Sequence, residues 1–538
     1  MKYGFVIDNR KCIGCHACTV ACKSEHDVPV GVNRTWVKQV EKGEYPDTRR
    51  VFSVMRCNHC TDAPCVDICP TQALFIREDG IVDFDNRRCI GCKGCMQACP
   101  YDALYIDPDT HTAAKCNYCA HRVDVGLEPA CVNVCPEHAI VSGDMENPSS
   151  EIAQLLSRQQ VTLRKAEKGT QPNVFYINGD EASLNPTVTE PKDNYMWSSQ
   201  SGGVGHFSRY TEKLVADKNL LQEAAKNSEP KDKRPTTTVE AVMNKTKRVY
   251  DVPSKGMLWG WEVSAYVWTK AISAGLVMVL AFSALFNASY MNDSSWYSIL
   301  GSALFFLVLT TALLVMDLDQ PKRFIYVLLR PQWKSWLVKG GYALTIFGGL
   351  ITLAIASRFF NWGIDKPVLY AAAIIGVVVA VYTAFLFAQA KGRDFWQSPT
   401  LAIHMLLHSF IAGTSFLVII MYFYGWSHFW HGFVTIVLFG SIGLNLIVTA
   451  FELYTTHSTN DAEIAVKSIV SGKYAVRFWA VAIALGNIIP LILMSNWGPE
   501  GMSNWGPEGY LIASVCMLVG SLIHEKIWVE APQQIPLS

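Results

Sequence analysis

The residues best suited to chemistry in this sequence are sixteen cysteines that lie between positions 12 and 135. They form four runs, and two of the runs share a spacing of two, two and three intervening residues. Thiolates in such compact runs, with a fourth cysteine followed by proline, are typical of [4Fe–4S] ligation. The four runs are Cys12, Cys15, Cys18, Cys22; Cys57, Cys60, Cys65, Cys69; Cys89, Cys92, Cys95, Cys99; and Cys116, Cys119, Cys131, Cys135.

Two other uses of cysteine fit the pattern less well. A disulfide scaffold needs an oxidising compartment, and neither a secretory signal nor a twin-arginine pair is seen before Cys12. Zinc ribbons use paired C-x₂-C knuckles rather than four-cysteine runs ending in x₃-C-P. Pro70, Pro100 and Pro136 follow three of the fourth cysteines. We therefore expect sixteen thiolates to hold four [4Fe–4S] clusters.

The second run resembles a known family. Residues 57–70 read Cys-Asn-His-Cys-Thr-Asp-Ala-Pro-Cys-Val-Asp-Ile-Cys-Pro, and together with the other runs they resemble the four-cluster iron–sulfur subunit of the dimethyl sulfoxide reductase and polysulfide reductase class. The resemblance implies that each cluster takes three cysteines from one run and the fourth from another. The implied sets are Cys12, Cys15, Cys18 with Cys135; Cys116, Cys119, Cys131 with Cys22; Cys57, Cys60, Cys65 with Cys99; and Cys89, Cys92, Cys95 with Cys69.

Composition separates the chain into two unlike halves. The 538 residues include 46 basic and 46 acidic side chains, which argues against a strongly basic nucleic-acid-binding protein. The charges are unevenly placed, because residues 259–528 hold only 26 of them. A single soluble globular domain is thereby excluded.

The cysteine-rich half contains an internal repeat. The sequence Cys-Pro-x-x-Ala-Leu occurs at residues 69–74 and 99–104, and a close variant occurs at residues 135–140. Each copy runs into a β-prone segment, and Asp79-Gly80 marks a hairpin between residues 74–76 and 81–84. We expect an α+β fold of duplicated ferredoxin-like iron–sulfur modules over residues 1–180. Residues 181–257 are polar and are expected to form a linker, with a short amphipathic helix over residues 211–226.

The second half, residues 258–530, contains eight apolar runs of about the 20 residues that cross a bilayer as a helix. We therefore expect an all-α bundle of eight transmembrane helices, with both ends of the bundle on one side. The runs lie near residues 262–286, 298–316, 336–357, 368–388, 400–424, 430–450, 476–494 and 509–527.

Basic residues are distributed unevenly across these spans. Fifteen Lys or Arg residues fall on the side of the iron–sulfur half, whereas Arg358 and Lys366 lie on the other side. By the positive-inside rule, we expect a multi-pass protein of the prokaryotic inner (cytoplasmic) membrane with the iron–sulfur domain facing the cytoplasm.

A few ionisable side chains interrupt the apolar helices, and such groups are functional candidates because they are costly to bury in a membrane. Glu262, Tyr266 and Lys270 recur every four residues along one stripe of the first helix. Such a stripe offers hydrogen-bond donors and a proton route to a quinone, whereas interfacial anchoring with Lys270 snorkelling is the alternative. Asp317 ends the second helix and is a further proton-path candidate, although capping would explain it equally well.

His404 and His408 share one face of the fifth helix. Proton transfer or quinone contact and structural hydrogen bonding are both compatible with this pair. Haem is not expected, because haem b normally takes its axial ligands from two helices.

The membrane half also resembles the eight-helix membrane subunit of polysulfide reductase, at Trp259-Gly260-Trp261-Glu262 and at residues 317–324. The histidine and asparagine that contribute to the quinone site near this helix start in that family have no counterpart in this stretch. Together the two resemblances imply a fused electron-transfer subunit of a quinone-linked oxidoreductase complex. It would pass electrons between menaquinone or ubiquinone and a separate molybdopterin-type catalytic subunit that holds the substrate chemistry. The alternatives are a quinol-oxidising subunit of a respiratory complex that feeds cytochromes, and a redox-linked ion pump.

Overall fold

The structure is a computed structural model, and it describes the chain except for residues 44–45, 190–245, 253, 287–292, 425–427 and 496–505. The chain divides into two compact units. Unit 1 comprises Met1–Leu258 and Pro536–Ser538, and unit 2 comprises Trp259–Ile535. The expected amphipathic helix over residues 211–226 lies outside the described residues.

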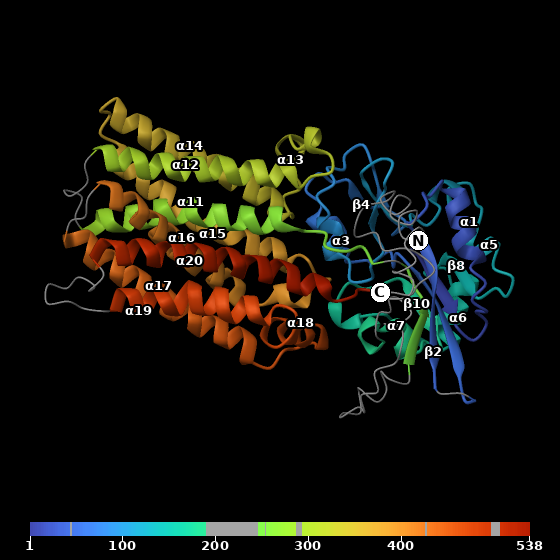
Figure 1. Cartoon of the computed structure of the whole chain (residues 1–538). Coiled ribbons are helices and arrows are strands. Elements are labelled where there is room, and N and C mark those ends of the chain that lie inside the picture. Colours follow the sequence, from blue (N-terminus) through green and yellow to red (C-terminus); the bar gives the residue numbers. More distant parts are fainter. Residues whose placement is uncertain (44–45, 190–245, 253, 287–292, 425–427, 496–505) are drawn as a thin grey trace, which may run out of the picture. The chain divides into compact units, whose positions relative to one another are not determined.

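A four-stranded sheet forms the centre of unit 1 (Figure 1). Its strand order is β8-β1-β10-β9, in which β1 runs parallel to β10 and antiparallel to β8. Residues Phe5 to Ile7 of β1 are fully buried, since α6 and the cysteine loops cover the sheet. The element bounds are β1 Tyr3–Asp8, β8 Ile140–Asp144, α6 Glu151–Arg158, β9 Val161–Thr162 and β10 Val174–Ile177.

The predicted hairpin after the first Cys-Pro repeat is present. Strands β4 (Leu74–Ile76) and β5 (Val82–Phe84) pair antiparallel, and Gly80 takes the positive φ of 80° that the turn requires. The second repeat leads into the similar pair β6 (Tyr105–Ile106) and β7 (Ala113–Ala114), and the third leads into β8. Short helices carry or adjoin the cysteine runs: α1 Ala17–Glu25, α2 Pro64–Ile68, α3 Gly94–Ala98, α4 Ala120–Val123 and α5 Ala130–Asn133.

A second sheet, with the order β11-β2-β3, uses residues from the stretch expected to be a linker. Asp251, just after β11, accepts a hydrogen bond from Trp36 Nε1 at 2.9 Å and lies 3.3 Å from Arg248 and 3.8 Å from Lys38. These charged groups are buried because they pair with one another. The end of the polar stretch is thus part of unit 1. The bounds are β2 Thr35–Lys42, β3 Arg49–Arg56, α7 Glu181–Leu184 and β11 Thr246–Tyr250.

Unit 2 contains, within the described residues, eight helices that are long and apolar enough to span a membrane, as the sequence predicts (Figure 1). The seventh span begins as a π-helical stretch, Arg477–Ile488, and continues as α19. Short helices α13 (Tyr326–Leu329) and α18 (Asn460–Val470) lie between spans. The long helices are α11 Trp261–Phe286, α12 Asp293–Met316, α14 Trp336–Phe359, α15 Asp365–Ala388, α16 Thr400–Tyr424, α17 His428–Tyr454, α19 Ile489–Ser495 and α20 Gly506–Glu530.

Helix α11 lies at the centre of this bundle and packs against α12, α15, α16 and α20. Its close approach to α16 depends on two glycines, because a Cβ atom on Gly275 would collide with the backbone of Ser409 and one on Gly413 with the backbone of Gly275. Small residues allow membrane helices to approach closely, where dispersion forces and hydrogen bonds hold them. This packing carries the polar residues of α11 and α16 into the interior of the bundle.

Candidate functional site

Unit 1 brings its sixteen cysteines, all of them free thiols, into four groups of four. Each group takes three cysteines from one run and its fourth from a distant run, and these are the sets that the resemblance implies. We name them group A (Cys12, Cys15, Cys18, Cys135), group B (Cys22, Cys116, Cys119, Cys131), group C (Cys57, Cys60, Cys65, Cys99) and group D (Cys69, Cys89, Cys92, Cys95).

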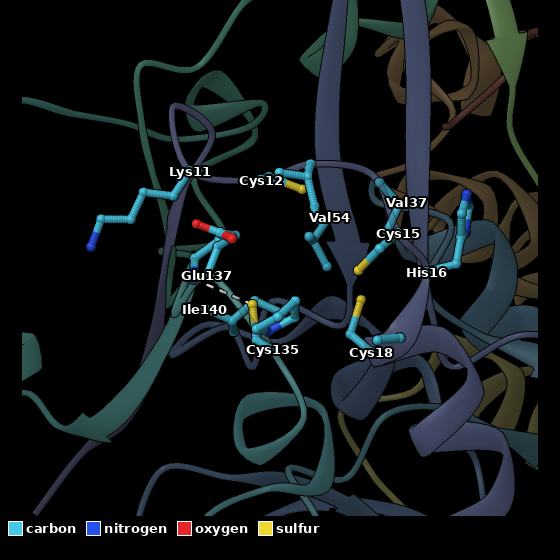
Figure 2. A pocket seen from close by; sticks show the side chains of 14 residues that line it. Lys11, Cys12, Cys15, His16, Cys18, Val37, Val54, Cys135, Glu137 and Ile140 are labelled. Carbon is cyan, nitrogen blue, oxygen red and sulfur yellow. Dashed lines mark hydrogen bonds between the residues drawn. The ribbon is translucent and has the colours of Figure 1, made fainter.

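Group A lines a single cavity, in which the four sulfur-bearing side chains lie around a common space (Figure 2). Val37, Val54 and Ile140 form apolar walls of this cavity. The backbone N–H of Ala139 donates to Cys135 Sγ at 3.3 Å. An apolar cavity with four thiols and an N–H···S bond fits an iron–sulfur cube, whose sulfurs accept such hydrogen bonds.

Groups B, C and D are identified by the thiols that raise the pKa of one another. Burial raises the pKa of Cys22 well above its usual value, and the nearby thiols Cys116, Cys131 and Cys119 raise it further. The same two causes act on one thiol of each remaining group. Burial and neighbouring thiols raise the pKa of Cys65, beside Cys99, Cys57 and Cys60, and of Cys95, beside Cys92, Cys89 and Cys69.

Buried thiolates in such groups need positive charge, and iron supplies it when a cluster binds. Two buried basic side chains add to it. Arg56 Nη1 donates to Cys131 Sγ at 3.3 Å and also interacts with Cys116 and Cys18. Burial raises the pKa of Cys57, while Lys115 beside it lowers that pKa.

The cysteine loops have a backbone shape suited to wrapping around a cluster. In the first run Gly14 and His16 have φ values of 71° and 61°, and in the third run Gly91 and Lys93 have 72° and 57°. Alternating left-handed residues turn successive N–H groups toward one concave side, which is a common arrangement at iron–sulfur sites. The near-equal values show that the two runs repeat in structure as well as in spacing.

The groups follow one another in the order A, B, C, D. Cys18 of group A interacts with Cys131 of group B, Cys57 of group C interacts with Cys116 of group B, and Cys95 of group D interacts with Cys65 of group C. All eight thiols of groups B and C are buried. Cys15 of group A is exposed, and Cys89 and Cys92 of group D are partly exposed. The four groups therefore form a linear series, in which the two middle groups are buried and the two end groups are accessible.

In unit 2, Lys270 lies buried inside the bundle. Its ammonium donates to Thr383 Oγ1 at 2.6 Å and to the carbonyl oxygen of Ala380 at 3.1 Å, and it lies 4.7 Å from the centre of the Tyr382 ring. It therefore does not snorkel to the membrane surface. The prediction that Lys270 snorkels is wrong, because α15 provides partners for the ammonium within the bundle.

Tyr266 is buried one turn from Lys270, within electrostatic range of Tyr382, Asp317 and Glu525. Asp317 is half-buried at the end of α12, and Glu262 is half-buried in the first turn of α11. The structure therefore brings Tyr266 and Lys270 together at Thr383, with Asp317 within electrostatic range of Tyr266.

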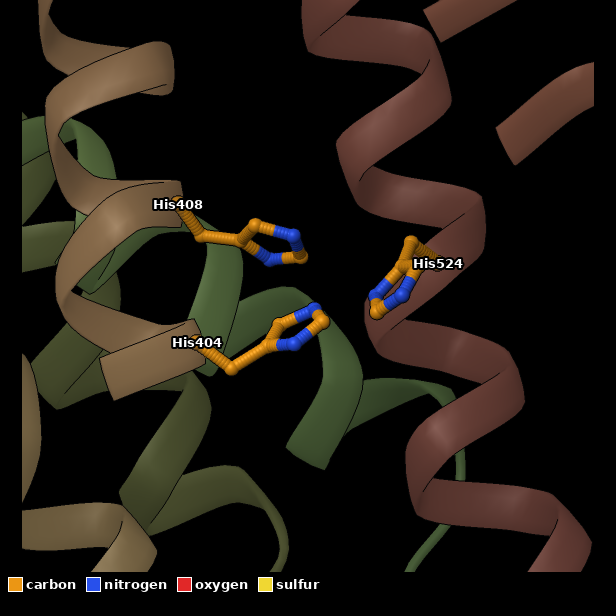
Figure 3. A group of neighbouring side chains, drawn as sticks. All are labelled: His404, His408 and His524. Atoms are coloured by element: carbon orange, nitrogen blue, oxygen red, sulfur yellow. The ribbon is translucent and has the colours of Figure 1, made fainter. Parts of the chain in front are cut away.

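His404 and His408 lie side by side with ring centres 4.4 Å apart, and α20 adds His524 to them (Figure 3). His524 lies 4.6 Å from each of the other two rings. Glu525 Oε1 lies 2.6 Å from His408 Nδ1. His524 and Glu525 are not among the residues expected from the sequence, although the polar His-Glu-Lys triplet near the end of the last apolar run is a usable signal.

Comparison with known proteins agrees with both halves of this description. Residues 11–74 and 49–145 match the family described as 4Fe-4S dicluster domain, and residues 251–535 match the family described as Polysulphide reductase, NrfD.

The chain is similar to several components of reductases. It is 47% identical over 191 residues to a tetrathionate reductase subunit of Salmonella typhimurium, which covers 35% of this chain and 76% of that protein. It is 43% identical over 181 residues to a polysulfide reductase chain of Wolinella succinogenes, covering 33% and 94%. It is 34% identical over 225 residues to the arsenate respiratory reductase iron-sulfur subunit ArrB of a Shewanella species, covering 33% and 96%. These matches and the fold show that the chain belongs to the polysulphide reductase NrfD family, with 4Fe-4S dicluster domains on the same polypeptide as the membrane domain.

Proposed function

We propose that this protein relays electrons between membrane quinone and a separate catalytic subunit through four [4Fe–4S] clusters, ligated by groups A to D. The observation that carries the proposal is the continuous order of the four groups. Each group neighbours the next, and the middle pair is buried while the ends reach the surface. Buried middle clusters are shielded from water and oxidants, and electrons enter and leave at the exposed ends.

The membrane unit supplies the quinone side of the proposal. Reduction or oxidation of a quinone moves two electrons and two protons, so its site needs hydrogen-bond donors for the ring oxygens and a route for protons. Lys270 and Tyr266 are donors buried in the bundle, with Asp317 and Glu262 at the end of the bundle where α11 begins. This gathering of donors and carboxylates supports a quinone site with menaquinone or ubiquinone as its ligand.

A partner subunit is required, because this chain lacks an evident site for substrate chemistry among its described residues. The relatives are named as single subunits or chains of reductases, one of them as an iron-sulfur subunit, which supports a separate catalytic subunit. The resemblance implies that this partner is of the molybdopterin class. The positive-inside rule supports an inner-membrane protein with unit 1 in the cytoplasm.

The proposal is tested on the full chain purified without oxygen. Four clusters correspond to about sixteen iron atoms and sixteen sulfides per chain. A short-chain quinol should pass its electrons to the clusters and produce the paramagnetic signals of reduced clusters within seconds, while the quinol itself becomes the quinone and releases its two protons. An iron content well below sixteen contradicts the cluster count, and clusters that exchange no electrons with any quinone or quinol contradict the quinone link.

The variant Lys270→Met tests the membrane site separately. Removing the ammonium should slow quinol-linked cluster reduction by about 10²–10⁴-fold, the range for losing a proton-transfer group, with the cluster signals unchanged. Lys339→Met is the matched control, since Lys339 lies over the Trp336 ring and is not part of the proposed site. Equal rates in the two variants would remove Lys270 from the mechanism.

A further inference from the structure

Three histidines meet inside the membrane bundle, and the distances between their ring nitrogens suit metal binding. His404 and His408 come from α16 and His524 from α20, and all three are buried. One nitrogen from each ring lies within 4.8 Å of the others, and Figure 3 shows the three rings turned toward a shared space.

The nitrogens of two of these rings make no hydrogen bonds within the part of the chain that the structure describes. Both ring nitrogens of His404 and both ring nitrogens of His524 are buried without a hydrogen-bond partner among the described residues. A neutral imidazole has one donor and one acceptor, and burying either without a partner is unfavourable. A metal ion accepts the lone pair of one nitrogen on each ring, which satisfies the acceptors together.

Carboxylates stand behind two of the rings, as they do behind metal-ligating histidines in general. Glu525 Oε1 lies 2.6 Å from His408 Nδ1, and Glu452 Oε2 lies 3.6 Å from His404 Nδ1. A carboxylate at Nδ1 fixes the tautomer and leaves the other nitrogen for a metal. Two buried carboxylates also balance the charge of one divalent cation in a medium of low dielectric constant.

We propose that His404, His408 and His524 bind one divalent first-row transition-metal ion, of which Zn²⁺ is the representative. Imidazole nitrogens prefer such ions to Mg²⁺ or Ca²⁺. The three nitrogens lie within 4.8 Å of one another, and zinc–nitrogen bonds of about 2.0–2.1 Å require the rings to rotate toward one another when the ion binds. The ion ties α16 to α20, and a cavity of about 330 Å³ lies beside the group, because Glu452, which lines it, is 3.6 Å from His404.

This inference is independent of the proposed quinone site, because a metal tie between two helices requires no redox partner. It gives His404 and His408 a role other than the proton transfer, quinone contact or structural hydrogen bonding that the sequence left open. Trp528 stacks on His524, with ring centres 4.0 Å apart, and so holds that ring in place.

The test uses the full chain purified in detergent without chelators, supplemented with Zn²⁺ and analysed for metals. We expect one zinc ion per chain in addition to cluster iron. Absorption at the zinc K-edge should show nitrogen and oxygen ligands at about 2.0–2.1 Å with imidazole scattering. Wild-type protein that binds no zinc, or zinc with sulfur ligands at about 2.3 Å from a misloaded cysteine group, would overturn the proposal.

Variants locate the ion. His524→Gln should lose the bound zinc, and Glu525→Gln, which removes only the carboxylate behind His408, should weaken zinc binding about 10–100-fold. His111→Gln is the matched control, since it removes an exposed histidine of unit 1 far from the group in sequence, and it should keep the ion. Undiminished zinc in His524→Gln would place the ion elsewhere, and the wild-type spectrum decides the matter even if a variant does not fold.

Discussion

Replacing Arg56 with methionine should lower the reduction potentials of the clusters in groups A and B. The guanidinium is fully buried, donates to Cys131 Sγ at 3.3 Å and also interacts with Cys18. A nearby positive charge stabilises an electron added to the cluster. Removing the guanidinium charge therefore makes reduction of the cluster less favourable. Methionine keeps an unbranched apolar stem of similar length but removes the guanidinium, whose carbon lies 4.2 Å from the centre of the Phe5 ring.

The size of the shift follows from Coulomb's law. The electron is shared over a whole cluster, so an effective separation of about twice the 3.3 Å contact is appropriate. At an effective dielectric constant of about 20, two unit charges about 6.6 Å apart interact by ~2.5 kcal/mol. For a one-electron couple this corresponds to ~100 mV.

The assay is a redox titration followed by electron paramagnetic resonance, with iron content measured on the same sample. Arg56→Lys keeps the charge and should retain most of the potential, and Arg50→Met removes an exposed charge that water and salt screen. If Arg56→Met keeps its iron and every midpoint stays within ~20 mV of the wild-type value, the electrostatic reasoning is wrong.

Three further predictions follow from particular contacts. Cys22→Ser should remove or convert only the group B cluster, so iron falls by at most about four atoms per chain while three cluster signals persist; loss of all signals would show that the groups do not assemble separately. Gly275→Ala should lower the melting temperature, because the added Cβ forces α11 away from α16 at a cost of about 1–3 kcal/mol or more. Gly301→Ala should leave the melting temperature unchanged, because a Cβ there meets no atom within 4 Å. Equal effects of the two substitutions would contradict the close packing. Asp251→Ala should destabilise unit 1 by about 3–5 kcal/mol, because it leaves buried cations without their carboxylate. Asp251→Asn can still accept a hydrogen bond from Trp36 and should cost less. Urea unfolding measures both, and an Asp251→Ala variant with unchanged stability would show that this end of the polar stretch is not packed.

Local patterns were sufficient for much of the fold. A cysteine run, a Cys-Pro repeat with Asp79-Gly80, and a stretch of about 20 apolar residues each impose structure on nearby residues. The hairpin β4–β5 and the eight spans could therefore be predicted from the sequence. The strand β11 could not, because Arg248 and Asp251 lie in a stretch with the composition of a solvated linker, and only the structure shows that they pair with each other and that Asp251 also lies beside Lys38 of β2.

The sequence by itself determined what kinds of ligand the chain offers: four runs of thiols in one half and a few ionisable groups in an otherwise apolar half. Only the tertiary structure decided which of them meet. It joins Cys22 to a run that begins 94 residues later, and His524 to a pair on another helix. Spacing along the chain controls only neighbours within a few residues, whereas contacts between distant residues depend on how sheets and helices pack.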